Sequence, residues 1–201
     1  MPKKLKIGIT GGIGSGKSIV SDFIESEGYA VLRADPIAKD LMQNDESIKK
    51  QLIKTFGEQS YHNGKLNTKF LAANVFFDKE KLEKITSIIH PPTLKFLDNK
   101  SSGILKKKDL VFVESALVYE AKFADMFDYV VLIYADEKTR IDRTLKRDKI
   151  PAEQIKRRMK FQLPDENKKD NADFVIENNS SIEELKLRTK FVLNLLTSLA
   201  K

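Results

Sequence analysis

The eight residues from Gly11 to Ser18 constrain this chain more than any other segment. Their sequence, Gly-Gly-Ile-Gly-Ser-Gly-Lys-Ser, fits the phosphate-loop pattern at every fixed position. Glycines let the backbone curl so that successive N–H groups point inward at phosphate oxygens. In this pattern Lys17 reaches the terminal phosphates and Ser18 holds Mg²⁺. The segment therefore predicts a binding site for the phosphates of a nucleotide.

The segments on either side of the loop favour the same interpretation. Residues 6–10 form a short apolar run that is typical of a buried parallel strand. Four apolar residues after the loop recur at helical spacing: Ile19, Val20, Phe23 and Ile24. Gly28 is a plausible end for this helix, whose positive N-terminal end near Ser18 would add to the anion site. A glycine-rich turn that binds nothing is the alternative, and a chance match rarely falls between a strand and a helix.

Length and composition limit the class of protein. With 201 residues, of which 41% are hydrophobic, the chain is expected to form one domain over residues 1–201. It has no cysteine, which excludes disulfides and thiolate metal sites. No apolar stretch reaches the length that spans a bilayer, and the run after the N-terminus is too short for a signal peptide. These features suit a cytoplasmic enzyme.

The chain is basic, with a formal net charge of +7. Such a balance is compatible with nucleic acid, a membrane surface or a small polyanion as partner. The one run of lysines, residues 106–108, precedes an apolar strand and is interpreted as a solvated turn. Neither zinc-finger spacing nor an aromatic-rich RNA-binding motif is present. We therefore expect a small polyanion, and neither nucleic acid nor a membrane.

Short apolar runs alternate with helical patterns along the chain. Besides residues 6–10, four runs resemble strands covered on both faces: residues 30–32, 110–113, 129–134 and 174–176. The last helix is expected to bury one stripe of six residues: Ile182, Leu185, Val192, Leu195, Leu196 and Leu199. The alternation predicts an α/β fold with a three-layer, doubly wound, parallel sheet of five strands. Ligands then bind beyond the carboxyl ends of the strands.

Two regions interrupt this alternation. Residues 36–100 contain helical segments and no clear strand, and they are interpreted as a substrate-binding insertion. Residues 137–169 contain a highly charged pair of helices, broken at Ile150-Pro151, and are interpreted as a mobile lid rich in arginine. The remaining segments, about 1–35, 101–136 and 170–201, would form the core.

Two carboxylates follow predicted strands directly. Asp35 comes after the second strand, where it could accept a hydroxyl proton or order water around Mg²⁺. A turn or helix-cap aspartate before Pro36 is the alternative. Glu114 ends the third strand, where it could touch the water shell of the metal or cap the next helix.

A row of arginines marks the charged region. Arg140, Arg143 and Arg147 are three and four residues apart, which places them on one helix face. Arg157 and Arg158 follow beyond the proline. Such a row can close over transferring phosphates and stabilise their negative charge. The alternative is a solvated face paired with three nearby acids: Asp142, Asp148 and Glu153.

A few further polar residues lie near the ends of predicted elements. His90 precedes two prolines at the end of an apolar helix pattern, and we interpret it as a hydrogen-bonded structural group. Gln162, Asn178 and Asn179 are, taken alone, ordinary loop or cap residues.

Taken together, these segments resemble the dephospho-coenzyme A kinases, which are phosphate-loop kinases similar to the nucleoside monophosphate kinases. The resemblance runs from Ile7 to about Asn179. Its markers occur in family order: Ile9 to Ser18, Ala34-Asp35, Gly64-x-Leu66, Val75-Phe76, His90-Pro91, Leu117 to Glu120, Arg143 through Arg147-Asp148, Arg158 through Gln162, Ala172-Asp173 and Asn178-Asn179. An ordered set of this kind is far more specific than a phosphate loop.

The resemblance implies that ATP donates its γ-phosphoryl group to the ribose 3′-hydroxyl of dephospho-coenzyme A, with Mg²⁺ as cofactor. The catalytic residues would be Asp35, Lys17, Arg143 and Arg147. ATP would be bound by Gly12, Ile13, Gly14, Ser15, Gly16, Lys17, Ser18, Ile19, Arg143 and Asn178. The acceptor would meet Asp35, His90 and Glu114, and Ser18 would hold the metal with waters. The enzyme would be a monomer or a small homo-oligomer.

The chain departs from the family pattern in four places. Asp-Ala-Asp is replaced by Arg33-Ala34-Asp35, and the second residue after the loop's lysine is Ile19 where threonine is commoner. The segment from Glu114 to Glu120 lacks a proline, and Asn67-Thr68 stands for Asp-Arg. These changes concern the acceptor more than ATP. The alternatives are therefore a kinase for a nucleoside monophosphate, shikimate or gluconate, or a nucleic-acid-stimulated ATPase.

Overall fold

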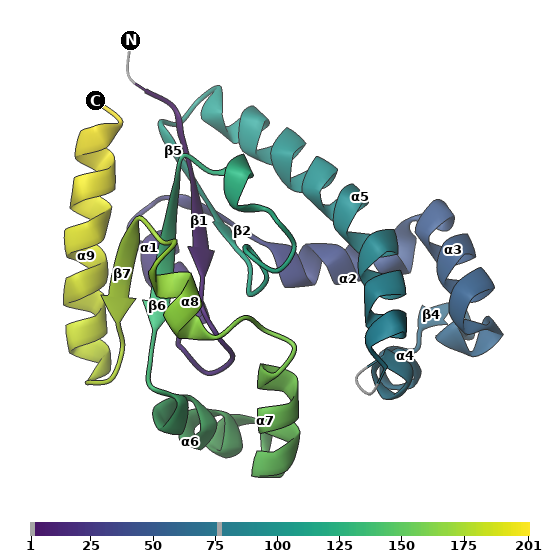
Figure 1. The fold of residues 1–201 in the computed structure, drawn as a ribbon. Helices are drawn as coiled ribbons and strands as arrows, with labels where there is room; N and C mark the ends of the chain where they lie inside the picture. The colour runs from purple at the N-terminus through teal and green to yellow at the C-terminus, as the bar shows by residue number, and fades with distance from the viewer. Residues whose placement is uncertain (1–2, 76–77) are drawn as a thin grey trace. The chain divides into compact units, whose positions relative to one another are not determined.

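A five-stranded parallel sheet forms the centre of the first of two compact units in the computed structural model, which describes residues 3–75 and 78–201 (Figure 1). This unit comprises the described chain up to Arg33 and from Asn99 onward. Its strands, in spatial order, are β2 (Ala30–Arg33), β5 (Leu110–Glu114), β1 (Leu5–Thr10), β6 (Tyr129–Tyr134) and β7 (Phe174–Glu177). All neighbouring strands are parallel, which confirms the predicted fold class.

The strand order places β1 at the point where the chain changes direction across the sheet. The chain passes from β1 to β2 and β5 on one side, and then to β6 and β7 on the other. In open parallel sheets, ligands bind at the carboxyl edge beside such a point. The predicted phosphate loop follows β1 and therefore begins there.

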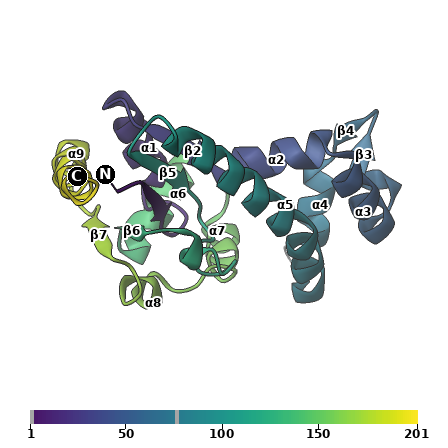
Figure 2. The ribbon, with the colours of Figure 1, turned by 90° about the horizontal axis from the view of Figure 1, so that it is seen from above.

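Helices cover both faces of this sheet. They are α1 (Lys17–Ser26), α8 (Asp165–Lys169) and α9 (Ile182–Leu199), whereas α6 (Glu137–Asp148) and α7 (Ala152–Met159) lie beyond the carboxyl ends of the strands (Figure 1). Seen along the strands, α1 lies on one side of the sheet and α8 on the other (Figure 2). The break expected at Pro151 is confirmed, because α6 ends before it and α7 begins after it. Of the helices that the structure describes, none has the length and apolar character needed to cross a membrane.

The main core lies between the sheet and two helices, α1 and α9. Leu5, Ile7 and Ile9 alternate along β1 and are fully buried, as period-2 side chains on a covered face must be. They meet Val20 of α1 and Leu196 of α9 in one cluster. This packing fixes the carboxyl end of β1 and the first turn of α1, between which the loop is held.

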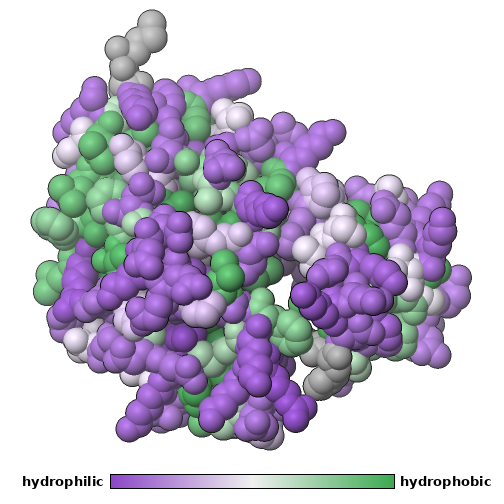
Figure 3. Space-filling model, viewed as in Figure 1, coloured by the Kyte–Doolittle hydropathy of each residue, from purple (hydrophilic) through white to green (hydrophobic). Residues whose placement is uncertain are grey.

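Helix α9 buries a different stripe from the predicted one. Its buried residues are Leu185, Thr189, Val192, Leu193 and Leu196. Ile182, Leu195 and Leu199 of the predicted stripe are 51%, 39% and 45% exposed, so that part of the prediction is wrong. The buried stripe includes a polar residue, Thr189, whose hydroxyl donates to the carbonyl of Leu185 at 2.7 Å and is thereby satisfied within the core. Figure 3 shows the resulting hydrophobic surface on the side where α9 lies.

The second unit, Ala34–Asp98, is mainly helical. It contains α2 (Ala34–Asn44), α3 (Glu46–Phe56), a 3₁₀ turn (Glu58–Ser60), α4 (Thr68–Val75) and most of α5 (Lys79–Leu105). The expectation of no strand in this region is wrong, since β3 (Tyr61–His62) and β4 (Lys65–Leu66) form a small hairpin. Its turn residues Asn63 and Gly64 both have positive φ, the conformation that tight hairpins favour. Phe76 of the Val75-Phe76 marker lies outside the described residues.

Helix α5 continues through both of its prolines. The expectation that the helix ends at His90 is therefore wrong, because Pro91 and Pro92 lie inside α5. An interior proline removes a backbone donor and crowds the preceding turn, which kinks or breaks a helix, but its fixed φ is helical and α5 continues past both prolines. The hydroxyl of Thr93 donates to the carbonyl of Ile89 at 2.8 Å within this stretch.

The orientation of α9 can be tested with two leucines. Leu196→Ala removes a side chain that is 1% exposed, so we expect the free energy of unfolding to fall by about 2–5 kcal/mol. Leu187→Ala, on the same helix but 71% exposed, should change it by less than about 0.5 kcal/mol. Chemical denaturation measures both. Equal losses would contradict the assigned orientation.

Candidate active site

The phosphate loop occupies the carboxyl edge of the sheet, between β1 and α1. Gly14 and Gly16 have φ values of 78° and 100°, which L side chains rarely adopt. The N–H of Ser15 donates to the carbonyl of Gly12 at 3.1 Å and closes a turn within the loop. The ammonium of Lys17 donates to the carbonyls of Gly11 and Gly12 at 2.8 and 3.2 Å. The lysine is thus folded over the loop, where a phosphate would compete for it.

The loop is tightly packed on the side away from this lysine. A Cβ added to Gly12 would lie 2.2 Å from Nη1 of Arg140, and one added to Gly14 would lie 2.4 Å from the carbonyl oxygen of Arg140. A Cβ on Gly16 would lie 2.3 Å from Nδ2 of Asn178. Real Cβ atoms do not approach other atoms so closely. Glycine is therefore required at these positions by tertiary packing as well as by phosphate binding.

Arg143 and Asn178 are both brought to the loop. The side-chain amide of Asn178 donates to the carbonyl of Ser15 at 2.7 Å, and Nη1 of Arg143 donates to the carbonyl of Asn178 at 2.9 Å. Asn178 is 4% exposed and directly follows β7. The structure thus gathers three of the residues expected to bind ATP, although their roles in binding stay predictions.

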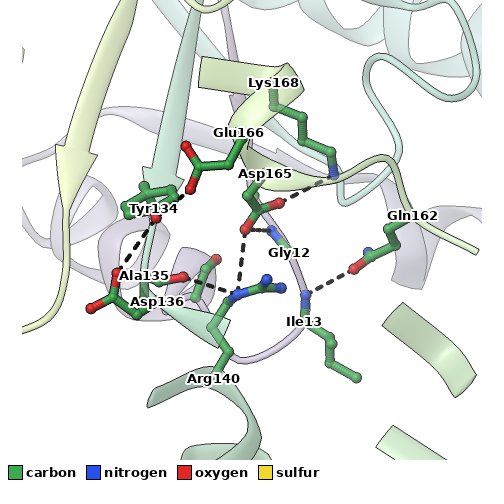
Figure 4. Close-up of polar contacts among 12 residues, drawn as sticks. Gly12, Ile13, Tyr134, Ala135, Asp136, Arg140, Gln162, Asp165, Glu166 and Lys168 are labelled. Carbon is green, nitrogen blue, oxygen red and sulfur yellow. Dashed lines mark hydrogen bonds and ion pairs between the residues drawn. The ribbon is translucent and has the colours of Figure 1, made fainter. Parts of the chain in front are cut away.

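Two side chains that sequence reasoning had not assigned to the site also hold the loop (Figure 4). The N–H of Ile13 donates to Oε1 of Gln162 at 2.9 Å, and the N–H of Gly12 donates to Oδ2 of Asp165 at 3.2 Å. Taken alone, the sequence around Gln162 predicts an ordinary loop residue, and nothing in it assigns Asp165 to the site. Gln162 closes one of the family markers, but neither contact follows from a local pattern, because both span about 150 residues of chain.

Glu114 and Ser18 meet beside the loop. The hydroxyl of Ser18 donates to Oε1 of Glu114 at 3.3 Å, and Nε of Arg33 lies 3.5 Å from Oε2 of Glu114. Glu114 does not cap the segment that follows it. The N–H of Leu117 is accepted instead by the hydroxyl of Ser115, at 3.2 Å. Arg33 stands where the family pattern has an aspartate, and here it is an ion-pair partner of Glu114.

Arg33 also ties β2 to α1. Its guanidinium lies 2.6 Å from Asp22 and 2.8 Å from Glu25, both on α1. The hydrogen bond with Glu25 and the surrounding carboxylates raise the pKa of Arg33, so the cation is retained. The two strand ends and the helix that carries Ser18 are therefore cross-linked by one side chain.

The predicted row of arginines is divided. Arg140 is 8% exposed, and its Nε donates to the carbonyl of Ala135 at 3.0 Å, which places it behind the loop. Arg147 lies two turns further along the same helix, where it is exposed and bonds Asp148 at 2.7 Å, which lowers the pKa of that carboxyl. Arg147 is therefore paired with a nearby acid in this structure, as the alternative of a solvated, ion-paired face expects. Arg143 alone of the three bonds the segment beside the loop.

The basic charge of the chain is concentrated beside the loop. Residues 137–169 carry twelve lysines and arginines against six aspartates and glutamates, so this segment holds +6 of the net +7. The other residues are nearly neutral in sum. Figure 3 shows a largely hydrophilic surface at the lower end of the view, where α6 and α7 lie. A positive field confined to one segment suits a small polyanion better than a long nucleic acid.

Asp35 and His90 belong to the second unit. Asp35 is exposed in the first turn of α2, immediately after β2, where the positive end of the helix favours a carboxylate. His90 lies within α5, and burial lowers the pKa of its imidazole, which is therefore neutral at pH 7. Among the described residues, no group of three or more histidine, aspartate or glutamate side chains could hold a metal ion.

Comparison with known proteins gives matches over most of the chain. A family model described as dephospho-CoA kinase matches residues 5–184. A dephospho-CoA kinase of Bacteroides fragilis is 39% identical over 175 residues, which cover 87% of this chain and 85% of the relative. One of Fusobacterium nucleatum is 39% identical and covers 89% and 92%. The crystal structure of TT1252 from Thermus thermophilus superposes with a TM-score of 0.83 at 33% identity, covering 96% and 98%.

The packing of the loop can be tested with two glycines. Gly16→Ala puts a methyl group 2.3 Å from Asn178 at a φ of 100°, so we expect it to abolish detectable ADP binding. Gly103→Ala is the matched control, because no atom lies within 4 Å of its Cβ and its helix should gain about 0.5–1 kcal/mol. Isothermal calorimetry measures binding. Normal binding by Gly16→Ala would mean that the loop is not held as described.

Proposed function

The chain belongs to the dephospho-CoA kinase family, and we propose that it transfers the γ-phosphoryl group of ATP to the 3′-hydroxyl of dephospho-CoA. The products are CoA and ADP, and the reaction is the last step of CoA biosynthesis. The observation that carries this proposal is a phosphate loop with Lys17 folded over it, in a chain that matches the family over residues 5–184. We expect the enzyme to act in the cytoplasm on small molecules.

Catalysis in this site rests on positioning and on neutralising charge. Phosphoryl transfer asks little covalent chemistry of the protein, since the transition state spreads negative charge over the phosphoryl oxygens. The loop amides and Lys17 would hold the phosphates, with Gly12 to Ile19 lining ATP. Arg143 would add a cation beside the loop, where its bond to the backbone of Asn178 already orients it. Arg147, which is exposed near the C-terminal end of α6, would reach the phosphates when the lid closes.

The residues near the loop fit Mg²⁺. This ion prefers oxygen ligands and binds through one or two protein groups together with waters and substrate phosphates. Ser18 would supply a hydroxyl ligand, and Glu114, held by Arg33, would accept hydrogen bonds from waters of the ion or from the acceptor. When bound, Mg²⁺ would neutralise charge on the phosphates of ATP.

The second unit supplies the acceptor side of the proposal. Asp35 is exposed and directly follows β2 in the chain, and in this proposal its carboxylate orients or deprotonates the 3′-hydroxyl. We propose that residues 36–100 bind the CoA portion, with His90 among the contacting residues, and that residues 137–169 act as the lid. A neutral His90 can donate or accept a hydrogen bond without adding charge.

An acceptor panel tests the function. With ATP and Mg²⁺, coupled ADP release should be fast with dephospho-CoA and near background with AMP, shikimate or gluconate. Lys17→Ala should abolish release, because it removes the positive charge that lies at the loop and would neutralise the γ-phosphate. Preference for another acceptor would overturn the assignment of substrate. Stimulation by DNA or RNA with steep salt dependence would instead favour the ATPase alternative.

The role of Asp35 is tested by a charge-neutral variant. Asp35→Asn should lower kcat by about 10²–10⁴-fold if the carboxylate takes the hydroxyl proton, with a smaller effect on KM for ATP. Asp40→Asn is the matched control, because Asp40 lies on the same helix and bonds Asn44 rather than a strand end. Unchanged turnover in Asp35→Asn would remove this residue from catalysis.

A further inference from the structure

Four ionisable side chains lie buried together behind the phosphate loop. The exposed fractions of their side chains are 10% for Arg140, 3% for Asp165, 0% for Lys168 and 14% for Glu120. Two are cations and two are anions, so the cluster is neutral as a whole. Burying ions is costly unless each is paired, and residues that only fill space could be apolar instead. The cluster therefore requires a reason beyond packing.

Asp165 is the member that touches the loop. Its Oδ2 accepts the N–H of Gly12 at 3.2 Å and lies 3.5 Å from Nε of Arg140 (Figure 4). Its Oδ1 lies 3.7 Å from Nζ of Lys168, which in turn approaches Oε1 of Glu120 at 2.8 Å. Among the described residues, neither Oδ1 of Asp165 nor Nζ of Lys168 has an aligned hydrogen-bond partner, so charge holds this part of the cluster.

The cluster also links the loop to the segments that follow β6. Arg140 lies on α6, and Asp165 and Lys168 lie on α8. The second contact of Glu120 is with the N–H of Leu163, just before α8, at 2.8 Å. Because a Cβ on Gly12 would lie 2.7 Å from Oδ2 of Asp165, the loop rests directly on this carboxylate. A shift of Asp165 must therefore shift the first turn of the loop.

We propose that Asp165 is a positioning residue for phosphoryl transfer, which holds Gly12 and Arg140 so that the loop keeps its anion-binding shape. Arg140 and Lys168 neutralise the carboxylate, so that it does not repel the phosphates bound on the other side. The proposal rests on the proposed function in taking a nucleotide as the ligand. It does not depend on the identity of the acceptor.

Two explanations of Asp165 predict effects of opposite sign. If Asp165 were merely a negative charge near an anion site, its removal would tighten nucleotide binding, since repulsion would be lost. If Asp165 positions the loop, its removal weakens binding even though the site becomes more positive. The sign of one measured change therefore separates the two explanations.

The variants Asp165→Asn and Glu166→Gln make this comparison. Both remove one negative charge from α8, but Glu166 is exposed and bonds the hydroxyl of Tyr134 instead of the loop. We expect Asp165→Asn to weaken ADP binding about tenfold in calorimetry, as loss of a charge-assisted hydrogen bond would, and to lower kcat as well. Glu166→Gln should stay within about twofold of the wild type. Asp165→Ala, which also removes the acceptor oxygen, should lose more than Asp165→Asn.

Hydrogen exchange separates positioning from general stability. In Asp165→Asn without ligand, amides of residues 11–16 should exchange faster, whereas those of β6 (Tyr129–Tyr134) should keep their wild-type rates. If Asp165→Ala fails to fold, Asp165→Asn alone carries the test. Tighter or unchanged ADP binding by folded Asp165→Asn, or a lowered melting temperature with normal loop exchange, would overturn the inference. A wild-type enzyme that binds ADP but does not phosphorylate dephospho-CoA would overturn the proposed function alone.

Discussion

The close contact between the phosphate loop and the side chains behind it is the constraint on which the rest of this structure depends. Glycine lets the loop present its amides and Lys17 on one side, and it lets Arg140, Asp165 and Asn178 approach the backbone on the other. A side chain at Gly12 or Gly16 would have no room on the packed side. Anion binding and tertiary packing thus impose the same residue at the same place.

The sheet topology delivers the other parts of the site to this loop. Because β5 and β6 flank β1, the residues that follow them reach the loop from both sides. Glu114, at the end of β5, meets Ser18, and Arg140 on the helix after β6 lies behind Gly12. The positive charge of the chain is concentrated in residues 137–169, which include Arg140 behind Gly12 and Arg143 bonded to Asn178. Charge and topology therefore support the same ligand class.

The sequence-based predictions were wrong where tertiary packing overrode a local pattern. Leu195 and Leu199 fit a helical stripe, but the buried face of α9 passes through Thr189, which satisfies its hydroxyl on its own helix. The prolines of α5 predicted an end, although their fixed φ is compatible with a helix. The Asn63-Gly64 turn was a readable hairpin signal, and it was missed because its strands have only two residues each.

The sequence by itself determined the phosphate loop, the five strands, the break at Pro151 and the family. Each of these depends on residues that are neighbours in the chain, or on the order in which short motifs follow one another. It also marked Arg143, through helical spacing and the resemblance, and Asn178, through the resemblance, as candidate ATP-binding residues. Only the tertiary structure decided that Asp165 and Gln162 hold the loop and that Arg140 lies behind it. Those contacts join segments far apart in the chain, so the spacing and the markers that single out Arg140 and Gln162 do not say what these side chains contact.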